Sequence, residues 1–361
     1  MRKLGIWLAL FLVTLLGVIT GWNWHAIQLR PQIVETSFRE RLVSPRSPQR
    51  AETPAIAQVE APAINPDRVL ADVEALASKR YTEAERSRTR EYIAAALQEA
   101  GWLPQFQTFE NGVNVVAERP GTDPSAGAIL VAAHYDTVEQ SPGADDNATG
   151  VAAVLETARL LGQFSTPRAL KLALFDLEEV GLVGSLAYAA DDSLTTNLAG
   201  AIIMDMIGFA CHTEGCQQYP AGLPISPPTD QGDFLAVIGD RGHMSLIDAF
   251  HQAALSESPQ VLSLPIPLLG PLTPDLLRSD HAPFWQKGIG AVMVTDTANF
   301  RNPNYHQATD TFESLDRPFL TGATQLVVNA TAALLSTPGS LTNDAAAPAP
   351  NLLEETQTTP L

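Results

Sequence analysis

The sequence predicts an α/β domain of three layers, in which a mostly parallel central sheet carries helices on both faces. Short, uninterrupted apolar runs such as residues 128–133 indicate strands that are buried on both sides of a sheet. Amphipathic helical segments separate these runs, as expected when helices connect parallel strands. With 361 residues, of which 45% are hydrophobic, the chain is long enough for one large domain with appendages.

The first expected elements are two helices that begin at capping signals. Asn65 is a capping residue, and it is followed by proline and aspartate in the first turn. Thr82 with Glu85 three residues later forms a capping-box pattern. We expect the helix that Thr82 opens to end at Gly101, because glycine commonly caps helix C-termini.

Strands and helices then alternate to the end of the predicted domain. Residues 105–109 and 113–117 indicate a strand pair with Asn111-Gly112 as its turn. The other expected strands are 128–133, 170–175, 199–204 and 290–294, and the other expected helices are 149–161, 184–190, 243–255 and 319–335. The Pro-rich stretches 207–233 and 256–276 are expected to form loops near a functional site.

The two ends of the chain are expected to lie outside this domain. Residues 4–24 carry no charge and are long enough for a transmembrane helix, which needs about 20 residues. The expected division is a transmembrane anchor over 1–24, a disordered Pro-rich linker over 25–64, the folded domain over 65–338 and a disordered tail over 339–361.

The charges beside the apolar segment predict its orientation. Arg2 and Lys3 favour an N-terminus that stays in the cytoplasm. We therefore expect a single-pass protein of the cell membrane, with the domain in the periplasm or outside the cell. A cleaved signal peptide is the alternative, although the segment offers no good cleavage site.

Composition and cysteine usage narrow the partners and the compartment. The net charge of −18 argues against a nucleic-acid partner, because phosphate binding needs clustered Lys and Arg. The two cysteines, Cys211 and Cys216, favour a disulfide that closes a small loop in an oxidising compartment. Free thiols and a metal pair with His212 remain as alternatives, although the spacing fits no common structural zinc site.

Acidic and imidazole side chains recur after four of the expected strands. Taken singly, each has an ordinary explanation as a helix cap or a solvated residue at a strand end. Ligands in such sheets bind outside the carboxyl ends of the strands, so the recurrence favours a common site. Two imidazoles and three carboxylates would suit a pair of zinc ions, and Glu178 would be left free to handle protons. The side chains concerned are His134, Asp136, Asp145, Asp146, Glu178, Glu179, Asp205 and His306.

These side chains stand in motifs that resemble those of the M28 zinc peptidases, most closely the bacterial secreted aminopeptidases. The motifs are His134-x-Asp136, Gly143-Ala144-Asp145-Asp146-x-x-x-Gly150, Glu178-Glu179-x-Gly181, Asp205, Arg278-Ser279-Asp280-His281-Ala282-Pro283-Phe284 and Tyr305-His306-x-x-x-Asp310-Thr311. The resemblance covers most of residues 65–338, and the motifs occur in the family's order. It implies a zinc-exopeptidase-like fold.

The resemblance also implies two zinc ions per chain and five ligands for them. His134 and Asp205 would hold one ion, and Glu179 and His306 would hold the other. Asp146 would bridge the two ions with its two carboxylate oxygens.

The same resemblance implies catalytic or supporting roles for further residues. Glu178 would be the general base and acid, and Tyr305 would stabilise the oxyanion. Asp136 would orient His134 through the ring nitrogen that does not bind metal. Arg278 matches a segment that shapes the amine end of the pocket.

The expected function is a membrane-anchored, extracytoplasmic dizinc aminopeptidase that hydrolyses the N-terminal peptide bond of peptides. One alternative is a glutaminyl cyclase-like acyltransferase, which typically uses one zinc ion, and the Asp145 and Glu178-Glu179 motifs lean toward the peptidase. The other is a non-catalytic, peptidase-like binding ectodomain, which would have lost ligands or the base. The sequence predicts no particular oligomeric state.

Four aromatic residues are candidates for an apolar substrate pocket, with ordinary core packing as the alternative. They are Phe209, Phe284, Trp285 and Phe300. If Phe209 or Phe284 lines the pocket, apolar N-terminal residues should be preferred.

Overall fold

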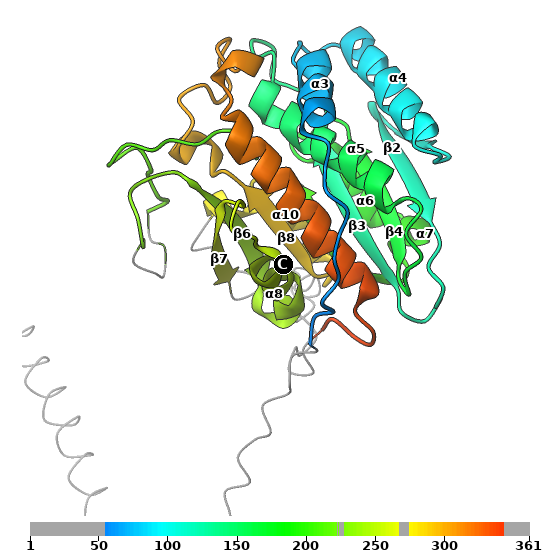
Figure 1. Ribbon diagram of the computed structural model, residues 1–361. Coiled ribbons are helices and arrows are strands. Elements are labelled where there is room, and N and C mark those ends of the chain that lie inside the picture. Colours follow the sequence, from blue (N-terminus) through cyan, green and yellow to red (C-terminus); the bar gives the residue numbers. More distant parts are fainter. Residues whose placement is uncertain (1–54, 222, 224–226, 267–273, 343–361) are drawn as a thin grey trace, which may run out of the picture. The chain divides into compact units, whose positions relative to one another are not determined.

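The computed structural model describes residues 55–221, 223, 227–266 and 274–342 (Figure 1). The predicted anchor over 1–24, most of the predicted linker and the tail from residue 343 lie outside the described residues. Among the described helices, one is long and apolar enough to cross a membrane, α10 (Arg317–Ser336). Because 72% of its apolar window is buried inside the domain, it is the core helix of this fold.

An eight-stranded sheet forms the centre of the domain, with the strand order β1-β2-β4-β3-β5-β8-β6-β7. The strands are β1 (Gln105–Phe109), β2 (Gly112–Arg119), β3 (Ala128–His134), β4 (Ala169–Phe175), β5 (Leu198–Met204), β6 (Phe234–Asp240), β7 (Gln260–Ile266) and β8 (Ala291–Thr295). The pairs β3–β4, β3–β5, β5–β8 and β6–β7 are parallel. The other three pairs are antiparallel, so the sheet is mixed, with four adjacent parallel strands at its centre.

Helices cover both faces of the sheet, as the sequence predicted. Besides α10, they are α3 (Pro66–Leu76), α4 (Glu83–Glu99), α5 (Gly150–Leu161), α6 (Val183–Ala190), α7 (Asp192–Thr195), α8 (Met244–Ala253) and α9 (Ala282–Gln286). Alternate residues of β3 face opposite sides: Ile129 and Val131 join a core built with α3, α4, α5, α8 and α10. Leu130 and Ala132 join a smaller core that includes residues of α6 and α9.

The capping signals in the sequence mark true helix starts. The side chain of Asn65 accepts a hydrogen bond from the Arg68 N–H, 3.1 Å away, at the start of α3. Thr82 and Glu85 form the reciprocal capping box of α4, with the Thr82 N–H 2.7 Å from the Glu85 carboxylate. The predicted strands and helices from residue 128 onward lie within two residues of their observed bounds.

The first hairpin differs from the prediction by one residue. Phe109 pairs with Gly112, so the two turn residues are Glu110 and Asn111. Gly112 therefore begins β2 and does not belong to the turn, which lengthens the predicted second strand at its start.

Two strands of the sheet were not expected from the sequence. β7 falls inside the Pro-rich stretch 256–276, where we predicted a loop, and β6 directly follows the other predicted loop. β7 is an edge strand, and Pro265 within it pairs with Gly239 of β6. Proline is tolerated there because an edge strand leaves one side of its backbone unpaired. The prediction of a loop over residues 260–266 was therefore wrong.

Residues 55–64 form an extended strap along α10, although we expected them to belong to the disordered linker (Figure 1). The Ala57 N–H donates to Thr337 Oγ1 at 3.0 Å, and the Ile64 N–H donates to Gln325 Oε1 at 2.8 Å. Side chains in and just after α10 thus accept hydrogen bonds from backbone N–H groups of the strap, which has no helix or sheet partner for them. Among the described residues, packing against the domain already begins ten residues before the predicted boundary.

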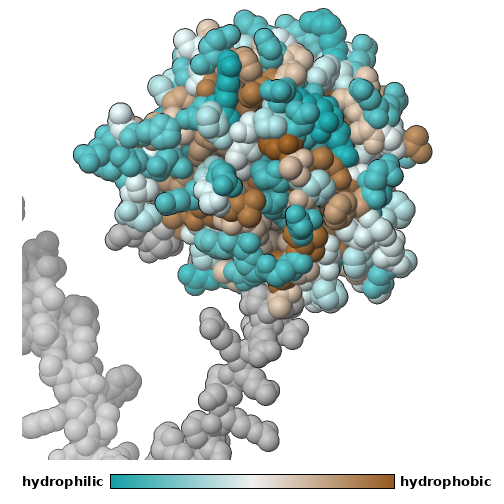
Figure 2. Space-filling view, viewed as in Figure 1, coloured by the Kyte–Doolittle hydropathy of each residue, from teal (hydrophilic) through white to brown (hydrophobic). Residues whose placement is uncertain are grey.

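Both ends of the described chain lie at the edge of the sheet where the parallel strands begin. Arg168 immediately precedes β4, and its guanidinium donates to the carbonyls of Thr337, at 3.0 Å, and Ala126. Ala57 contacts the same Thr337, and Figure 1 shows the strap and the end of α10 side by side. Figure 2 shows polar residues mixed with small apolar areas over the face that carries α10.

Candidate metal centre

The sheet topology brings the five expected ligand side chains to one edge. His134 is the last residue of β3, and Asp146 lies in the turn between β3 and α5. Glu179 follows β4, Asp205 follows β5 directly, and His306 lies in the segment after β8. These four strands are neighbours and run parallel, so their carboxyl ends meet at the same edge.

The carboxylate of Asp146 lies between the two imidazoles. Its Oδ1 is 3.3 Å from His134 Nε2, and its Oδ2 is 3.2 Å from His306 Nε2. Glu179 Oε2 is 3.0 Å from His306 Nε2, and Asp205 Oδ1 is 3.7 Å from His134 Nε2. One carboxylate is therefore positioned to serve two adjacent cation sites.

Two groups of three side chains could each hold one ion. His134, Glu178 and Asp205 form one group, and the second consists of Asp146, Glu179 and His306. Within each group, the ligand atoms lie within 4.8 Å of one another. The first group includes Glu178, to which the sequence resemblance gives a catalytic role, beside the two expected ligands.

The hydrogen bonding of these side chains is compatible with metal binding. Glu179 Oε1 is buried and has no hydrogen-bond partner among the described residues, and His306 Nε2 has only carboxylate oxygens beside it. Buried polar atoms are normally hydrogen-bonded, so such unpaired atoms require an explanation. Imidazole nitrogen and carboxylate oxygen are ligands that zinc accepts, and the residues present therefore fit a zinc site.

The carboxylates control the protonation of the two imidazoles in the metal-free protein. Burial alone lowers the pKa of His306, but Asp146 and Glu179 outweigh burial and raise it to about 10. Burial likewise acts against protonation of His134, and the surrounding carboxylates raise its pKa well above the ordinary value. The same negative charge would attract a metal cation, which displaces these protons when it binds.

Glu178 is held by its backbone next to the ligands. Its N–H donates to Asp136 Oδ1 at 3.0 Å, and the Glu179 N–H donates to Asp136 Oδ2 at 3.2 Å. Asp136 Oδ1 is also 3.5 Å from His134 Nδ1, which is near the ring that the sequence expects it to orient but longer than an ordinary hydrogen bond. Burial, with the nearby carboxylate of Asp280, raises the pKa of the Glu178 carboxyl well above its ordinary range.

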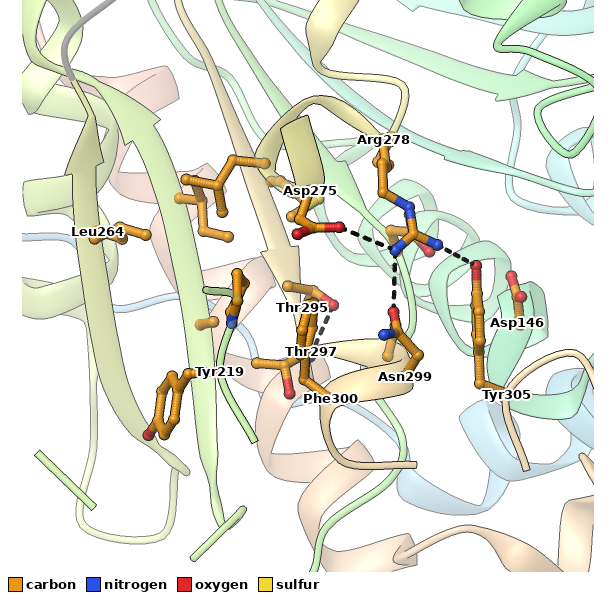
Figure 3. Close-up of a pocket in the computed structure, with 18 of the residues that line it drawn as sticks. Asp146, Tyr219, Leu264, Asp275, Arg278, Thr295, Thr297, Asn299, Phe300 and Tyr305 are labelled. Atoms are coloured by element: carbon orange, nitrogen blue, oxygen red, sulfur yellow. Dashed lines mark hydrogen bonds and ion pairs between the residues drawn. The ribbon is translucent and has the colours of Figure 1, made fainter. Parts of the chain in front are cut away.

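Tyr305 and Arg278 lie at the mouth of the site. The Tyr305 ring stacks on the His306 ring with 3.8 Å between centroids, and the Tyr305 hydroxyl accepts a hydrogen bond from Arg278 at 3.0 Å. Arg278 also donates to Asn299 Oδ1 at 3.2 Å and lies 3.6 Å from Asp275. Figure 3 shows Arg278 between these three side chains, with Asp146 beyond the Tyr305 ring.

A cavity of about 430 Å³ runs from the expected ligands along β6 and β7. Its distal wall is apolar and includes Ile238, Leu262, Leu264, Met293 and Phe300. Figure 3 shows Leu264 and Tyr219 at the end of the cavity away from Asp146. Because the sequence did not predict β6 and β7, it did not predict the part of this wall that these two strands provide.

The four aromatic residues considered as pocket candidates occupy different positions in the structure. Phe300 lines the cavity. Phe284 is buried in the smaller core, with its ring 6.3 Å from that of Phe175. Trp285 is buried in the same core, and Phe209 is not among the residues that line the cavity, so the condition on which we expected apolar N-terminal residues to be preferred is not met.

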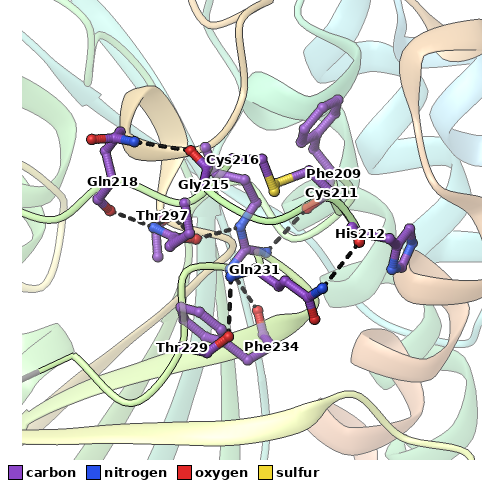
Figure 4. The surroundings of a disulfide bond; sticks show 12 residues. Phe209, Cys211, His212, Gly215, Cys216, Gln218, Thr229, Gln231, Phe234 and Thr297 are labelled. Carbon is purple, nitrogen blue, oxygen red and sulfur yellow. Dashed lines mark hydrogen bonds between the residues drawn. A yellow bond between two sulfur atoms is a disulfide. The ribbon is translucent and has the colours of Figure 1, made fainter.

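The predicted disulfide is present (Figure 4), and the residues that follow it in sequence line the cavity. Cys211 is bonded to Cys216, and their Cα atoms are 6.3 Å apart. The next residue, Gln217, lines the cavity and accepts a hydrogen bond from Arg301 Nε at 2.9 Å. Gln217 also donates to Thr297 Oγ1 at 2.9 Å, which joins the disulfide loop to the segment after β8.

Sequence reasoning named Asp145 but missed Asp296, the second member of a buried acidic pair next to the expected ligands. Asp145 and Asp296 are both 0% exposed, and Asp145 Oδ2 accepts a hydrogen bond from Asn302 at 2.8 Å. Burial and the nearness of Asp296 raise the pKa of Asp145 well above its usual value. Asp296 follows the apolar run of β8, so the signal that identified Asp205 could also have identified Asp296.

Comparisons with known proteins assign most of the folded part of this chain to a family. Residues 114–331 match the family model described as peptidase family M28. The chain is 35% identical over 217 residues to "Uncharacterized protein YfbL" of Escherichia coli, which covers 56% of this chain and 65% of that protein. It is 31% identical over 221 residues to "Probable lipoprotein aminopeptidase LpqL" of Mycobacterium tuberculosis, which covers 57% and 42%. The chain thus matches less than two thirds of the length of these relatives.

Solved structures share the fold. The LapA aminopeptidase of Legionella pneumophila superposes with a TM-score of 0.59 at 19% identity, over 76% of this chain and 73% of that chain. A glutaminyl cyclase of Porphyromonas gingivalis superposes with a TM-score of 0.57 at 20% identity, over 75% and 99%. The fold is therefore common to two different chemistries, and the site residues must distinguish them.

Proposed function

Because the chain belongs to peptidase family M28, we propose that it is a two-zinc aminopeptidase that removes the N-terminal residue from peptides. The observation that carries this proposal is the position of the Asp146 carboxylate, which lies 3.3 and 3.2 Å from the imidazoles of His134 and His306. The apolar cavity beside the metal centre supports it by offering space for a substrate side chain.

In the proposed centre, five side chains would hold two zinc ions. Asp146 would serve both ions, His134 and Asp205 would hold one, and Glu179 and His306 would hold the other. When bound, two zinc ions supply a Lewis acid that lowers the pKa of water and polarises a peptide carbonyl.

Glu178 moves the protons in the proposed reaction. It accepts a proton from the water that attacks the carbonyl carbon, and it returns this proton to the nitrogen as the C–N bond breaks. Asp136 keeps Glu178 in place through the two backbone hydrogen bonds of the turn.

Tyr305 is placed to stabilise the oxygen that becomes negative during this reaction. Arg278 donates to the Tyr305 hydroxyl oxygen, so the proton of Tyr305 remains free to be donated elsewhere. A preorganised donor of this kind stabilises developing charge in the transition state.

The acidic site favours a substrate with a free amino terminus. The carboxylates of Glu178 and Asp205 would hold a protonated α-amine through charge-assisted hydrogen bonds. N-acetylation removes this charge, so it should nearly abolish cleavage. Incubation of the full-length chain with matched free and N-acetylated peptides tests the proposal, and cleavage of the acetylated peptide from its C-terminus would contradict it.

A glutaminyl cyclase-like acyltransferase is the second candidate, because an enzyme with that activity shares the fold over 99% of its chain. The five clustered ligand side chains favour two ions, whereas cyclases of this type typically use one. Peptides that begin with Gln separate the two activities, because a cyclase would convert them without releasing an amino acid. The retention of all five ligand side chains and Glu178 also argues against a purely binding role.

We further propose that the chain is anchored in the cell membrane with its domain outside the cytoplasm. The uncharged segment 4–24 and the positive charges before it support this location. The disulfide between Cys211 and Cys216 also supports it, because such bonds persist in oxidising compartments.

A further inference from the structure

The loop that leads to Asp146 is held from both sides by buried charged side chains. We refer to residues 142–146 as the metal loop. Arg80 lies in the segment between α3 and α4 and is 0% exposed. Its guanidinium donates to the carbonyls of Pro142 at 2.9 Å and Gly143 at 2.8 Å.

Arg80 also connects the metal loop to the end of β3. Its Nε donates to the carbonyl of Tyr135 at 2.6 Å, directly after the ligand His134. The Arg80 backbone N–H donates to Thr137 Oγ1 at 3.0 Å. Among the described residues, no carboxylate lies within ion-pair distance of Arg80. The hydrogen bonds of its guanidinium instead go to backbone carbonyls, which ties the metal loop to the neighbouring segments.

Asp310 holds the other side of the metal loop. Its Oδ1 accepts from the Asp145 N–H at 2.9 Å, and its Oδ2 accepts from the Asp146 N–H at 3.1 Å. Its backbone carbonyl accepts from the Ala144 N–H at 3.1 Å. Asp310 is 0% exposed and lies four residues after His306, so it also connects the metal loop to the second imidazole.

At Gly143 the loop lies too close to its neighbours to accommodate a side chain. Its φ of +64° lies in the left-handed region, which favours glycine. A Cβ at this position would lie 2.7 Å from Arg80 Nη2 and would also meet the Asp146 carbonyl. The loop therefore packs directly on Arg80.

We propose that Arg80 and Asp310 are positioning residues that fix the metal loop before an ion binds, so that the Asp146 carboxylate faces both imidazoles. This inference rests on the proposed two-metal centre. A site that is already in its binding geometry loses less conformational freedom on binding, and groups that orient ligands raise affinity for this reason. Arg80 lies outside the segment that matches the family model.

The test compares zinc affinities of full-length variants by competition with a chelator of known affinity. Asp310→Asn keeps the shape but leaves one oxygen acceptor for two N–H groups. Arg80→Lys keeps the charge but loses the planar set of donors. We expect each change to raise the zinc dissociation constant by about 10- to 100-fold, as for other groups that orient metal ligands.

Glu156→Gln is the matched control. Glu156 is 0% exposed and forms a 2.7 Å ion pair with Arg68, away from the expected ligands. Urea unfolding of the metal-free proteins shows how much stability each variant has lost. The control should lose stability while its zinc dissociation constant stays within about twofold of wild type.

The combined Arg80→Lys/Asp310→Asn variant provides a second readout. Both residues act on one loop, so its loss of affinity should be smaller than the product of the two single losses. If Asp310→Asn does not fold, the comparison of the zinc dissociation constants of Arg80→Lys and Glu156→Gln tests the proposal. Zinc affinities within twofold of wild type, or an equal loss in the control, would overturn the role of Arg80 and Asp310. A wild-type chain that binds no zinc would instead overturn the proposed function.

Discussion

Adjacent glutamates that share one turn have different neighbours in the candidate metal centre. Glu179 Oε2 lies 3.0 Å from His306, whereas Glu178 is grouped with His134 and Asp205. The proposed mechanism gives Glu179 to metal binding and Glu178 to proton transfer. Glutamine substitution separates these roles, because it preserves size while removing the carboxylate.

The first prediction concerns these two glutamates. Glu178→Gln should keep zinc content near wild type while kcat falls by at least about 10²-fold, the scale of general-base catalysis. Glu179→Gln should instead lower the zinc content of the purified protein. Elemental analysis and steady-state kinetics of both variants measure the difference, and equal zinc loss in both would show that the roles are wrongly assigned.

The second prediction concerns Asp146 and the number of ions. The wild type should bind two zinc ions, and Asp146→Ala should lose the shared ligand and most activity. Binding should release protons at pH 7, because the carboxylates around His306 raise its pKa to about 10 and an ion displaces that proton. Affinity should therefore fall as the pH is lowered. Calorimetry in buffers of different ionisation enthalpy measures both quantities, and a wild type with one ion or none would refute the shared site.

At the scale of the elements, the strap over 55–64 has the clearest measurable consequence. Deleting it should lower the free energy of unfolding, because α10 loses the partners of Gln325 and Thr337 and an apolar contact around Ile56. Deleting residues 25–54 is the control and should leave the stability of the domain unchanged. Thermal unfolding measures both variants, and equal melting temperatures would show that the strap adds no stability.

Comparing the predicted with the observed helices and strands shows which parts of the fold the sequence alone predicts. Helices with capping residues and strands with continuous apolar runs were predicted within two residues, because local signals determine them. β7 and the strap were missed because their order comes from distant partners, β6 in one case and α10 in the other. The expected ligand side chains could be named because they stand in recognisable motifs near the ends of strands, whereas Arg80 stands in a polar segment without such a signal.

At the scale of the whole molecule, the next prediction concerns location. The segment 4–24 should remain in the mature protein, and protease added to spheroplasts should degrade the domain. N-terminal sequencing and proteolysis of the full-length chain measure the two outcomes. A mature N-terminus at or after residue 23 would favour a cleaved signal peptide, and a protected domain would contradict the proposed orientation.

The positions of residues 55 and 342, the first and last described residues, have a practical consequence for experiments on this domain. Residue 55 and residue 342 emerge at the edge where the parallel strands begin, while the candidate metal centre lies at the opposite edge. A bead, sensor chip or fusion partner attached directly at residue 55 or residue 342 of a trimmed domain would therefore leave the mouth of the cavity unobstructed. Ala57 and the end of α10 thus provide two neighbouring handles for immobilising the domain with its cavity facing the solution.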